Sequence, residues 1–174
     1  TWKEAPTKIQ WASGQDQMKM LDPNLPNVGL KGDMYTGPMF VSEEYKAFDG
    51  SVMAIDPSGR GKDKTGYVVV KMLHGILYLT AFGGLDGGYS EGTLKQLANI
   101  AKQQEVNQIV IESNMGDGMF NQILYPVLQK IYPCSMEEVR HSTQKEQRII
   151  DTLEPVMNQH RLVVDEKLIH DDFN

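Results

Sequence analysis

The stretch SVMAIDPSGRGKDKTGYVVVKMLHGILYLTAF, residues 51–82, decides the fold of this chain. Its first run, 51–56, is short and apolar and is closed by an acid and a proline, which is typical of a buried central strand. Two further apolar runs, 67–72 and 76–82, are separated by His74 and Gly75, a pair that favours a tight antiparallel turn. We therefore expect three consecutive strands connected as hairpins.

After residue 88 the spacing of the apolar residues changes from strand-like to helical. Leu94, Leu97, Ala98 and Ala101 share one face of a helix, and Ser90 is a good N-cap for it. Helical stretches then alternate with short apolar runs to the end of the chain. We expect helices over residues 90–101, 120–131 and 143–157, and strands over residues 107–112, 135–140 and 161–164.

Two details of this pattern carry expectations of their own. The glycine-rich run 83–88 lacks the lysine and the spacing of a phosphate-binding loop, so we expect turns there. The third helix is expected to bury an apolar stripe, which consists of Ile149, Ile150, Leu153, Val156 and Met157.

The order of elements, β-β-β-α-β-α-β-α-β, predicts an α/β fold. Three hairpin-connected strands followed by crossover units give a mixed sheet with helices on both faces. Because crossovers between parallel strands are short and right-handed, the strand at 107–112 should return parallel beside the strand at 51–56. This arrangement is ribonuclease H-like. It brings Asp56 and Glu112, the last residues of their strands, to the same carboxyl edge of the sheet.

Two carboxylates at one sheet edge predict a metal site. At a separation of ~4 Å they repel by roughly 4 kcal/mol at an effective dielectric of 20, so a shared proton or divalent cations must offset the repulsion. Oxygen ligands suit Mg²⁺ or Mn²⁺ better than zinc. Two such ions can activate water and stabilise the leaving oxygen of a phosphodiester. We therefore expect hydrolysis of a nucleic-acid backbone.

The loop between the first two strands adds charged candidates. Asp63 can fold back towards Asp56 as an auxiliary carboxylate. Basic side chains here and at the start of the third helix stand where phosphates would lie, although a solvated surface is the alternative interpretation for all of them. The basic candidates for DNA contact are Arg60, Lys62, Lys64, Lys145 and Arg148.

Composition limits the range of functions. A length of 174 residues fits one domain of ordinary core size, and no apolar run approaches the ~20 residues of a membrane helix. The 23 acidic and 17 basic residues leave a net charge of −6, which argues against DNA binding by charge alone. The single cysteine, Cys134, excludes an internal disulfide and predicts a reducing, cytoplasmic setting.

The first 50 residues differ in character from the rest. They hold four of the eight prolines and no lasting apolar period, so we expect an extended, loop-rich lead-in that drapes over a domain or links it to another. The folded domain should then occupy residues 51–174, with an incomplete C-terminal end. Because the chain opens at Thr1 without a leader, we expect a fragment of a longer protein.

Three motifs together resemble the nuclease domain of large terminase subunits, most strongly those of short-tailed, T-odd-type phages. They are the strand ending in Asp56 with its Pro-, Gly- and Asp-containing loop, the strand ending in Glu112 with Ser-Asn-Met-Gly-Asp-Gly at 113–118, and Lys-Glu-Gln-Arg-Ile at 145–149. The resemblance covers about residues 50–164. Residues 1–50 resemble the segment that joins this domain to the packaging ATPase.

This resemblance implies a ribonuclease H-like endonuclease that cuts concatemeric double-stranded DNA during genome packaging, with two Mg²⁺ or Mn²⁺ ions as cofactors. It implies that Asp56 and Glu112 are the first two metal-binding acids and that Asp63 is an accessory acid. The implied partners are double-stranded DNA, the upstream ATPase domain, the portal and procapsid, and the small terminase subunit. The implied setting is the host cytoplasm, with no membrane involved.

The family carries its third metal-binding acid in a His-Asp-Asp-like motif that opens a C-terminal apolar helix. Here His170, Asp171 and Asp172 offer the triplet at the end of the chain. The third ligand is therefore expected at Asp172 or Asp171, or in residues further downstream.

Three other functions stay open on the sequence alone. Ribonuclease H, resolvase or integrase-like enzymes use similar acids on the same fold. The actin and sugar-kinase superfamily also begins with three hairpin strands and an acidic phosphate loop, so the loop at 56–65 could hold ATP. Finally, the domain could be an interaction module that docks on the portal or procapsid.

Overall fold

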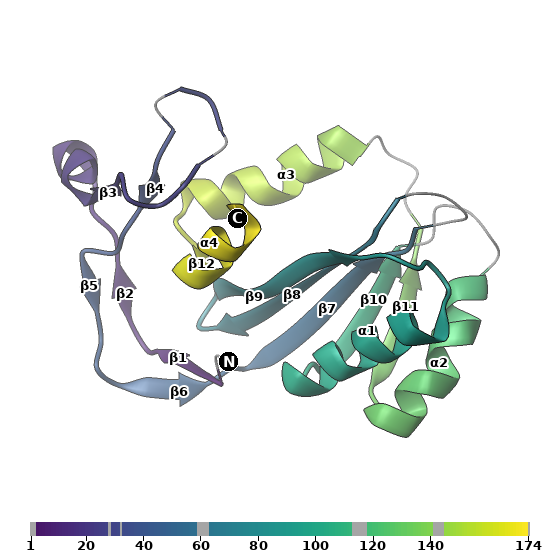
Figure 1. Cartoon of the computed structure of the whole chain (residues 1–174). Helices are drawn as coiled ribbons and strands as arrows, with labels where there is room; N and C mark the ends of the chain where they lie inside the picture. Colours follow the sequence, from purple (N-terminus) through teal and green to yellow (C-terminus); the bar gives the residue numbers. More distant parts are fainter. Residues whose placement is uncertain are drawn as a thin grey trace.

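The computed structural model describes residues 3–27, 29–31, 33–58, 63–112, 118–140 and 145–173. A six-stranded sheet forms its centre, built from β7 (Gly50–Asp56), β8 (Thr65–Leu73), β9 (Ile76–Leu85), β10 (Gln108–Glu112), β11 (Ser135–Val139) and β12 (Leu162–Val164). The strand order is β11-β10-β7-β8-β9-β12 (Figure 1).

The sheet has the mixed topology that the sequence predicts. β7, β8 and β9 pair antiparallel as successive hairpins. β10 returns parallel beside β7, and β11 lies parallel to β10. At the other edge β12 runs parallel to β9. The tight turn between β8 and β9 is made by His74 and Gly75, both with positive φ, as the residue pair indicated.

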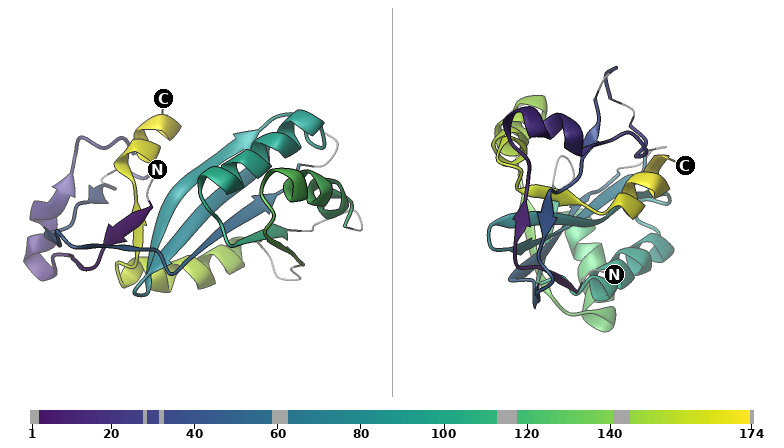
Figure 2. Two further views of the ribbon diagram at one scale, coloured as in Figure 1. Left: turned by 90° about the horizontal axis from the view of Figure 1, so that it is seen from below. Right: turned by 90° about the vertical axis from the view of Figure 1, so that its left-hand side faces the viewer.

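Four helices pack around this sheet: α1 (Glu91–Gln103), α2 (Met119–Ile131), α3 (Lys145–Asn158) and α4 (Glu166–Phe173). α1 and α2 cover one face, whereas α3 runs along the other side and α4 packs beside β9 (Figures 1 and 2). This confirms the prediction of a mixed α/β sheet with helices on both sides. Among the helices of the described segments, none has the length and apolarity needed to cross a bilayer.

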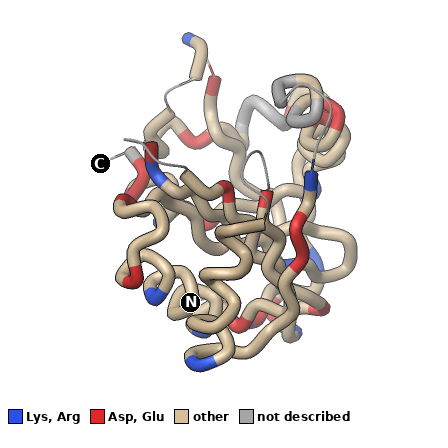
Figure 3. Tube along the Cα trace, turned by 90° about the vertical axis from the view of Figure 1, so that its right-hand side faces the viewer, with Lys and Arg blue, Asp and Glu red and all other residues tan. Residues whose placement is uncertain are grey.

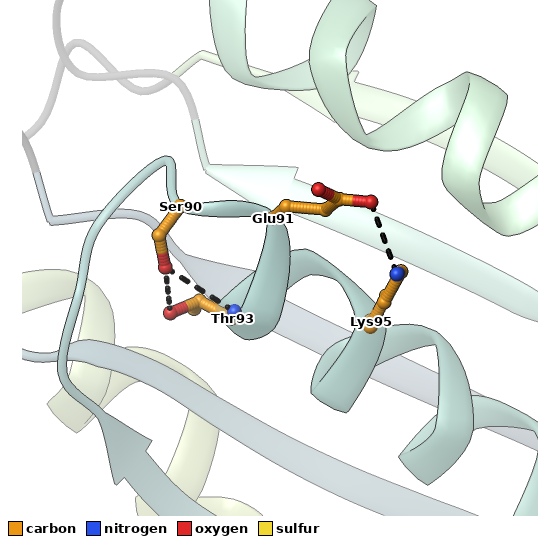
Figure 4. Close-up of polar contacts among 4 residues, drawn as sticks. All are labelled: Ser90, Glu91, Thr93 and Lys95. Atoms are coloured by element: carbon orange, nitrogen blue, oxygen red, sulfur yellow. Dashed lines mark hydrogen bonds and ion pairs between the residues drawn. The ribbon is translucent and has the colours of Figure 1, made fainter.

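The main core lies between the sheet and the pair α1 and α2. The predicted face of α1 is buried there, because its apolar residues repeat with the helical period. Ser90 caps this helix as expected, accepting a hydrogen bond from the Thr93 amide at 3.3 Å (Figure 4). The fully buried members of the core include Met53, Ile55, Leu97, Ile109, Ile111, Leu124 and Leu128.

The apolar stripe predicted for α3 is largely wrong. Ile150, Leu153 and Met157 are 51%, 39% and 58% exposed, although α3 runs along the second side of the sheet (Figure 1). The side chain of Ile149 lies outside the described residues. The predicted helical spacing of the apolar residues was correct. This spacing does not show whether another layer of the fold covers the apolar face of the helix.

The described residues before β7 form an extended ribbon of short antiparallel strand pairs. The ribbon docks on the sheet through a second buried cluster, in which Ala5 meets Leu73 and Tyr78. Trp11 stacks on His160, with ring centroids 6.0 Å apart. The elements of the ribbon are β1 (Glu4–Pro6), β2 (Ile9–Gln10), η1 (Gly14–Met20), β3 (Leu21–Asp22), β4 (Tyr35–Thr36), β5 (Phe40–Val41) and β6 (Tyr45–Ala47). β1 pairs with β6, β2 with β5, and β3 with β4.

Candidate active site

The carboxyl ends of β7 and β10 bring two acids together. Ile55 pairs with Ile111 across the two parallel strands, and Asp56 and Glu112 are the next residues along. Both isoleucines are buried against α1 and α2, so alternation along the strands turns the two acids to the opposite face. Neighbouring strands lie about 4.8 Å apart, so the two acids stand side by side at one edge of the sheet.

A cavity of about 500 Å³ opens on this second face and gathers three carboxylates. Asp56 and Glu112 contribute from the sheet, and Asp172 contributes from α4. Its apolar walls come from Ala54, Val68, Phe82, Val110 and Val139. Three acids from three separate stretches of the chain therefore share one partly apolar cavity.

Gly66 keeps the cavity open beside Asp56. Asp56 pairs with Gly66 on β8, and Gly66 pairs in turn with Gly84 on β9. A Cβ added to Gly66 would meet no atom within 4 Å. The prediction of turns throughout residues 83–88 was wrong at its start, since β9 continues to Leu85. Only Gly87 and Gly88, with positive φ, behave as turn residues.

Tyr67 supports the same region from the α1 side of the sheet. Its hydroxyl lies 2.9 Å from the position that a Cβ on Gly83 would take, so glycine is required there for the ring to pack across the strand pair. Burial raises the pKa of the Tyr67 phenol. Sequence reasoning passed over Tyr67, Gly66 and Gly84, because only the pairing register shows that they lie beside Asp56.

α4 places the two C-terminal acids differently. β12 pairs with β9, and the chain then re-enters beside β9 as α4. Asp172 lines the cavity described above, whereas Asp171 lines a second, more polar cavity of about 510 Å³ on the side of α1, which Asp172 also borders. The triplet His170-Asp171-Asp172 therefore lies in α4, and this helix brings Asp172 to the cavity that Asp56 and Glu112 line.

The donor chemistry fits a hard divalent cation, since the three carboxylates supply only oxygen. The ligand set is not closed, however. Within the described segments, no three Asp, Glu, His or Cys side chains are close enough to hold one ion together. The three carboxylates therefore line one cavity without forming a closed ligand cluster.

The remaining predicted residues lie around this cavity or outside the described segments. Asp63 is exposed and is not among the residues that line the cavity. The aliphatic part of Lys64 packs over Gly84, with carbons 3.1 to 3.7 Å from the Cβ position of that glycine. Arg60 and Lys62, and the side chains of Lys145 and Arg148, are not described, and residues 113–117 of the second motif are not described either.

Charge around this edge of the sheet is mixed. Figure 3 views the molecule from the end at which β7 and β10 terminate, and acidic and basic positions are scattered over the described part of that view without a continuous basic stripe. This distribution agrees with the net charge of −6. Attraction to phosphate must therefore be local rather than general.

The fold is of the ribonuclease H-like class, and comparison with known proteins identifies the family. The model of the family described as "Terminase Bacteriophage T7, Ribonuclease H-like domain" matches residues 55–162, so the chain belongs to this family. The large terminase subunit of Enterobacteria phage T3 is 43% identical over 172 residues, which cover 99% of this chain. The chain spans only 29% of the length of that relative.

Solved structures share the fold. The large terminase of a thermophilic bacteriophage superposes with a TM-score of 0.51 at 10% identity, over 69% of this chain and 29% of that one. The human cytomegalovirus terminase nuclease domain, soaked with manganese and bound to an inhibitor, gives 0.50 at 9% identity, over 70% and 64%. At these identities the likeness speaks for the fold alone.

Proposed function

We propose that this chain is a metal-dependent endonuclease domain that hydrolyses phosphodiester bonds of double-stranded DNA. The observation that carries the proposal is the side-by-side position of Asp56 and Glu112 at one sheet edge, with Asp172 on the same cavity. Membership of the terminase family favours DNA over the ribonuclease H, resolvase and ATP-binding alternatives.

Asp56, Glu112 and Asp172 are the proposed ligands, and two Mg²⁺ or Mn²⁺ ions are the proposed cofactors. Asp172 is preferred to Asp171 because it alone of the two borders the cavity that holds the other acids. When bound, the ions would supply an activated water and stabilise the leaving oxygen. That a manganese soak was used for the cytomegalovirus nuclease domain supports this choice of metal.

Residues around the cavity are proposed to position the substrate. The open space at Gly66 gives a phosphodiester room to approach Asp56. Asp63 is proposed as an accessory acid on the loop that follows β7. The proposed phosphate contacts are Arg60, Lys62, Lys64, Lys145 and Arg148, and with a net charge of −6 their binding to DNA should be weak and strongly dependent on salt.

Plasmid cleavage tests this proposal. Wild-type protein should nick or linearise plasmid in Mn²⁺, and chelation with EDTA should stop the reaction. Asp56→Asn should lower the rate more than about 100-fold. Asp49→Asn is the matched control, because Asp49 accepts a hydrogen bond from His74 at the far end of the sheet. Full cutting by Asp56→Asn would refute the proposal.

A second experiment compares cleavage of three nucleic acids and so tests which class of substrate the chain prefers. Plasmid, an RNA–DNA hybrid and a four-way junction are offered to the same preparation under the same conditions. Preference for the plasmid supports the terminase assignment. Preference for the hybrid or the junction would move the chain to ribonuclease H or resolvase chemistry, with the same acids.

We also propose that the chain acts within a longer large terminase subunit. The T3 relative is a large terminase subunit, and this chain matches 29% of its length. An ATPase domain upstream of residues 1–50, the portal, the procapsid and the small subunit are then the proposed partners, in the host cytoplasm. Co-purification of the portal with the full-length subunit, and its loss when residues 1–174 are deleted, would test the contribution of this chain.

A further inference from the structure

A buried pair of hydroxyls closes the base of the loop that follows β7. The Ser58 amide donates a hydrogen bond to Thr65 Oγ1 at 3.1 Å, and the two hydroxyl oxygens lie 3.1 Å apart. Ser58 is 5% exposed and Thr65 is 0% exposed. The loop between them carries Asp63 and Lys64, so this contact, here called the loop clamp, holds together the two ends of a charged segment.

The loop clamp extends the pairing of β7 and β8 beyond the last pair of the ladder. That last pair joins Asp56 to Gly66. Ser58 lies two residues beyond Asp56, and Thr65 immediately precedes Gly66. The chain is therefore held at Asp56 by the strand pair and again, two residues later, at Ser58 by the Thr65 hydroxyl.

The buried Thr65 hydroxyl is unusual, because an apolar side chain could fill the same space. Burial of a hydroxyl costs free energy unless a hydrogen bond compensates it, and an apolar residue of the same shape would need no such compensation. Valine is nearly isosteric with threonine and is favoured in strands. The Thr65 hydroxyl accepts a hydrogen bond from the Ser58 amide, and Ser58 lies two residues after Asp56, which lines the cavity. This contact therefore points to a role for Thr65 in setting the position of the Asp56 carboxylate.

We propose that Thr65 is a positioning residue for the active site: through Ser58 it fixes the direction in which Asp56 leaves β7. This inference rests on the proposed function, because it takes Asp56 to be a metal ligand. Loss of a contact that orients a metal ligand typically lowers metal affinity or activity by about 10- to 100-fold.

Two substitutions at Thr65 separate the hydroxyl from the shape of the side chain. Thr65→Val keeps the shape and removes the hydrogen bond, and Thr65→Ser keeps the hydroxyl. Affinity for Mn²⁺ is measured directly by calorimetry and by the rise in melting temperature with added Mn²⁺, alongside kcat and KM for plasmid. We expect Thr65→Val to weaken Mn²⁺ binding about tenfold and lower kcat with little change in KM, and Thr65→Ser to restore both.

Thr93→Val is the matched control. Thr93 is also a buried threonine, 3% exposed, and its hydroxyl donates to the Asp86 carbonyl oxygen at 2.6 Å and lies 2.9 Å from Ser90 Oγ (Figure 4). Thr93 lies in the first turn of α1, where its amide donates to the Ser90 cap, and it does not line the cavity. This variant should lose stability while keeping wild-type Mn²⁺ affinity and kcat.

Equal Mn²⁺ affinity and kcat in Thr65→Val and Thr93→Val would overturn the inference, as would failure of Thr65→Ser to restore them. If Thr65→Val does not fold, Ser58→Ala takes its place, with a smaller loss of about threefold expected because the amide contact to Thr65 remains. Wild-type affinity in Ser58→Ala would then overturn the inference. Absence of Mn²⁺ binding and cleavage in the wild-type protein would instead count against the proposed function.

Discussion

Replacing Gly66 by alanine should separate stability from activity. A Cβ at this position meets no atom within 4 Å, and the residue sits inside β8 without a positive φ. Glycine in a strand interior costs roughly 0.5–1 kcal/mol relative to alanine, so the variant should be more stable by that amount. For a chain of this size the melting temperature should rise by about 1–4 °C.

The same methyl group would stand on the floor of the cavity. Asp56 and Gly66 are directly paired, so the new Cβ would lie about 5 Å from that of Asp56. Displacement of a reacting group by about 1 Å can cost 100-fold in rate, so we expect plasmid cleavage to fall about tenfold in Gly66→Ala and further in Gly66→Val.

Calorimetry and plasmid cleavage are measured on the same preparations. Gly92→Ala is the matched control, because its Cβ in α1 also meets no atom within 4 Å and lies away from the cavity. It should gain stability and keep full activity. Wild-type cleavage by both Gly66 variants would refute the reasoning that the substrate approaches over this floor.

Three further predictions concern stability. Leu124→Ala empties a fully buried position between α2 and the sheet, and chemical denaturation should show a loss of about 2–5 kcal/mol. Tyr132→Phe removes the hydrogen bond to the Val106 carbonyl oxygen at 2.9 Å and should cost about 1 kcal/mol in the same assay. Burial lowers the pKa of the Lys71 ammonium below 10.5, and Glu105 opposes this shift. Because the unfolded chain then binds more protons between the folded pKa of Lys71 and 10.5, this residue makes stability rise with pH across that window. The free energy of unfolding of wild type minus that of Lys71→Met, measured from pH 7 to 10, should therefore increase, and a flat difference would contradict the assignment.

The parts of the fold that the sequence predicts are those fixed by local pattern. The strand at 51–56 and its neighbour at 107–112 are apolar runs closed by acids, and the right-handed crossover between them leaves only one parallel placement. Ser90 and the α1 face follow from capping chemistry and helical period. In each case a few adjacent residues hold the information.

The parts that could not be predicted depend on contacts between distant segments. The ribbon of residues 3–47 pairs strands of two or three residues, too short for a period to be visible. The row from Asp56 through Gly66 to Gly84 follows from the register of two hairpins, which includes a bulge at Val69 and Val70. The place of Asp172 depends on β12 joining β9 and directing α4 back to the site.

The exposed apolar residues of α3 show where a local pattern predicts too much. Ile150, Leu153 and Met157 have the spacing of a buried helix face, and the structure leaves them in solvent. Periodicity reports which face of a helix is apolar, and the packing of other layers decides whether that face is covered.

A crystal structure of this protein soaked in Mn²⁺, with the ion located by anomalous scattering, tests the proposed metal site. We expect manganese bound by the carboxylates of Asp56 and Glu112, with Asp172 drawn into the same ligand set. Manganese bound elsewhere, or an Asp56 carboxylate that makes no contact with the ion, would contradict it.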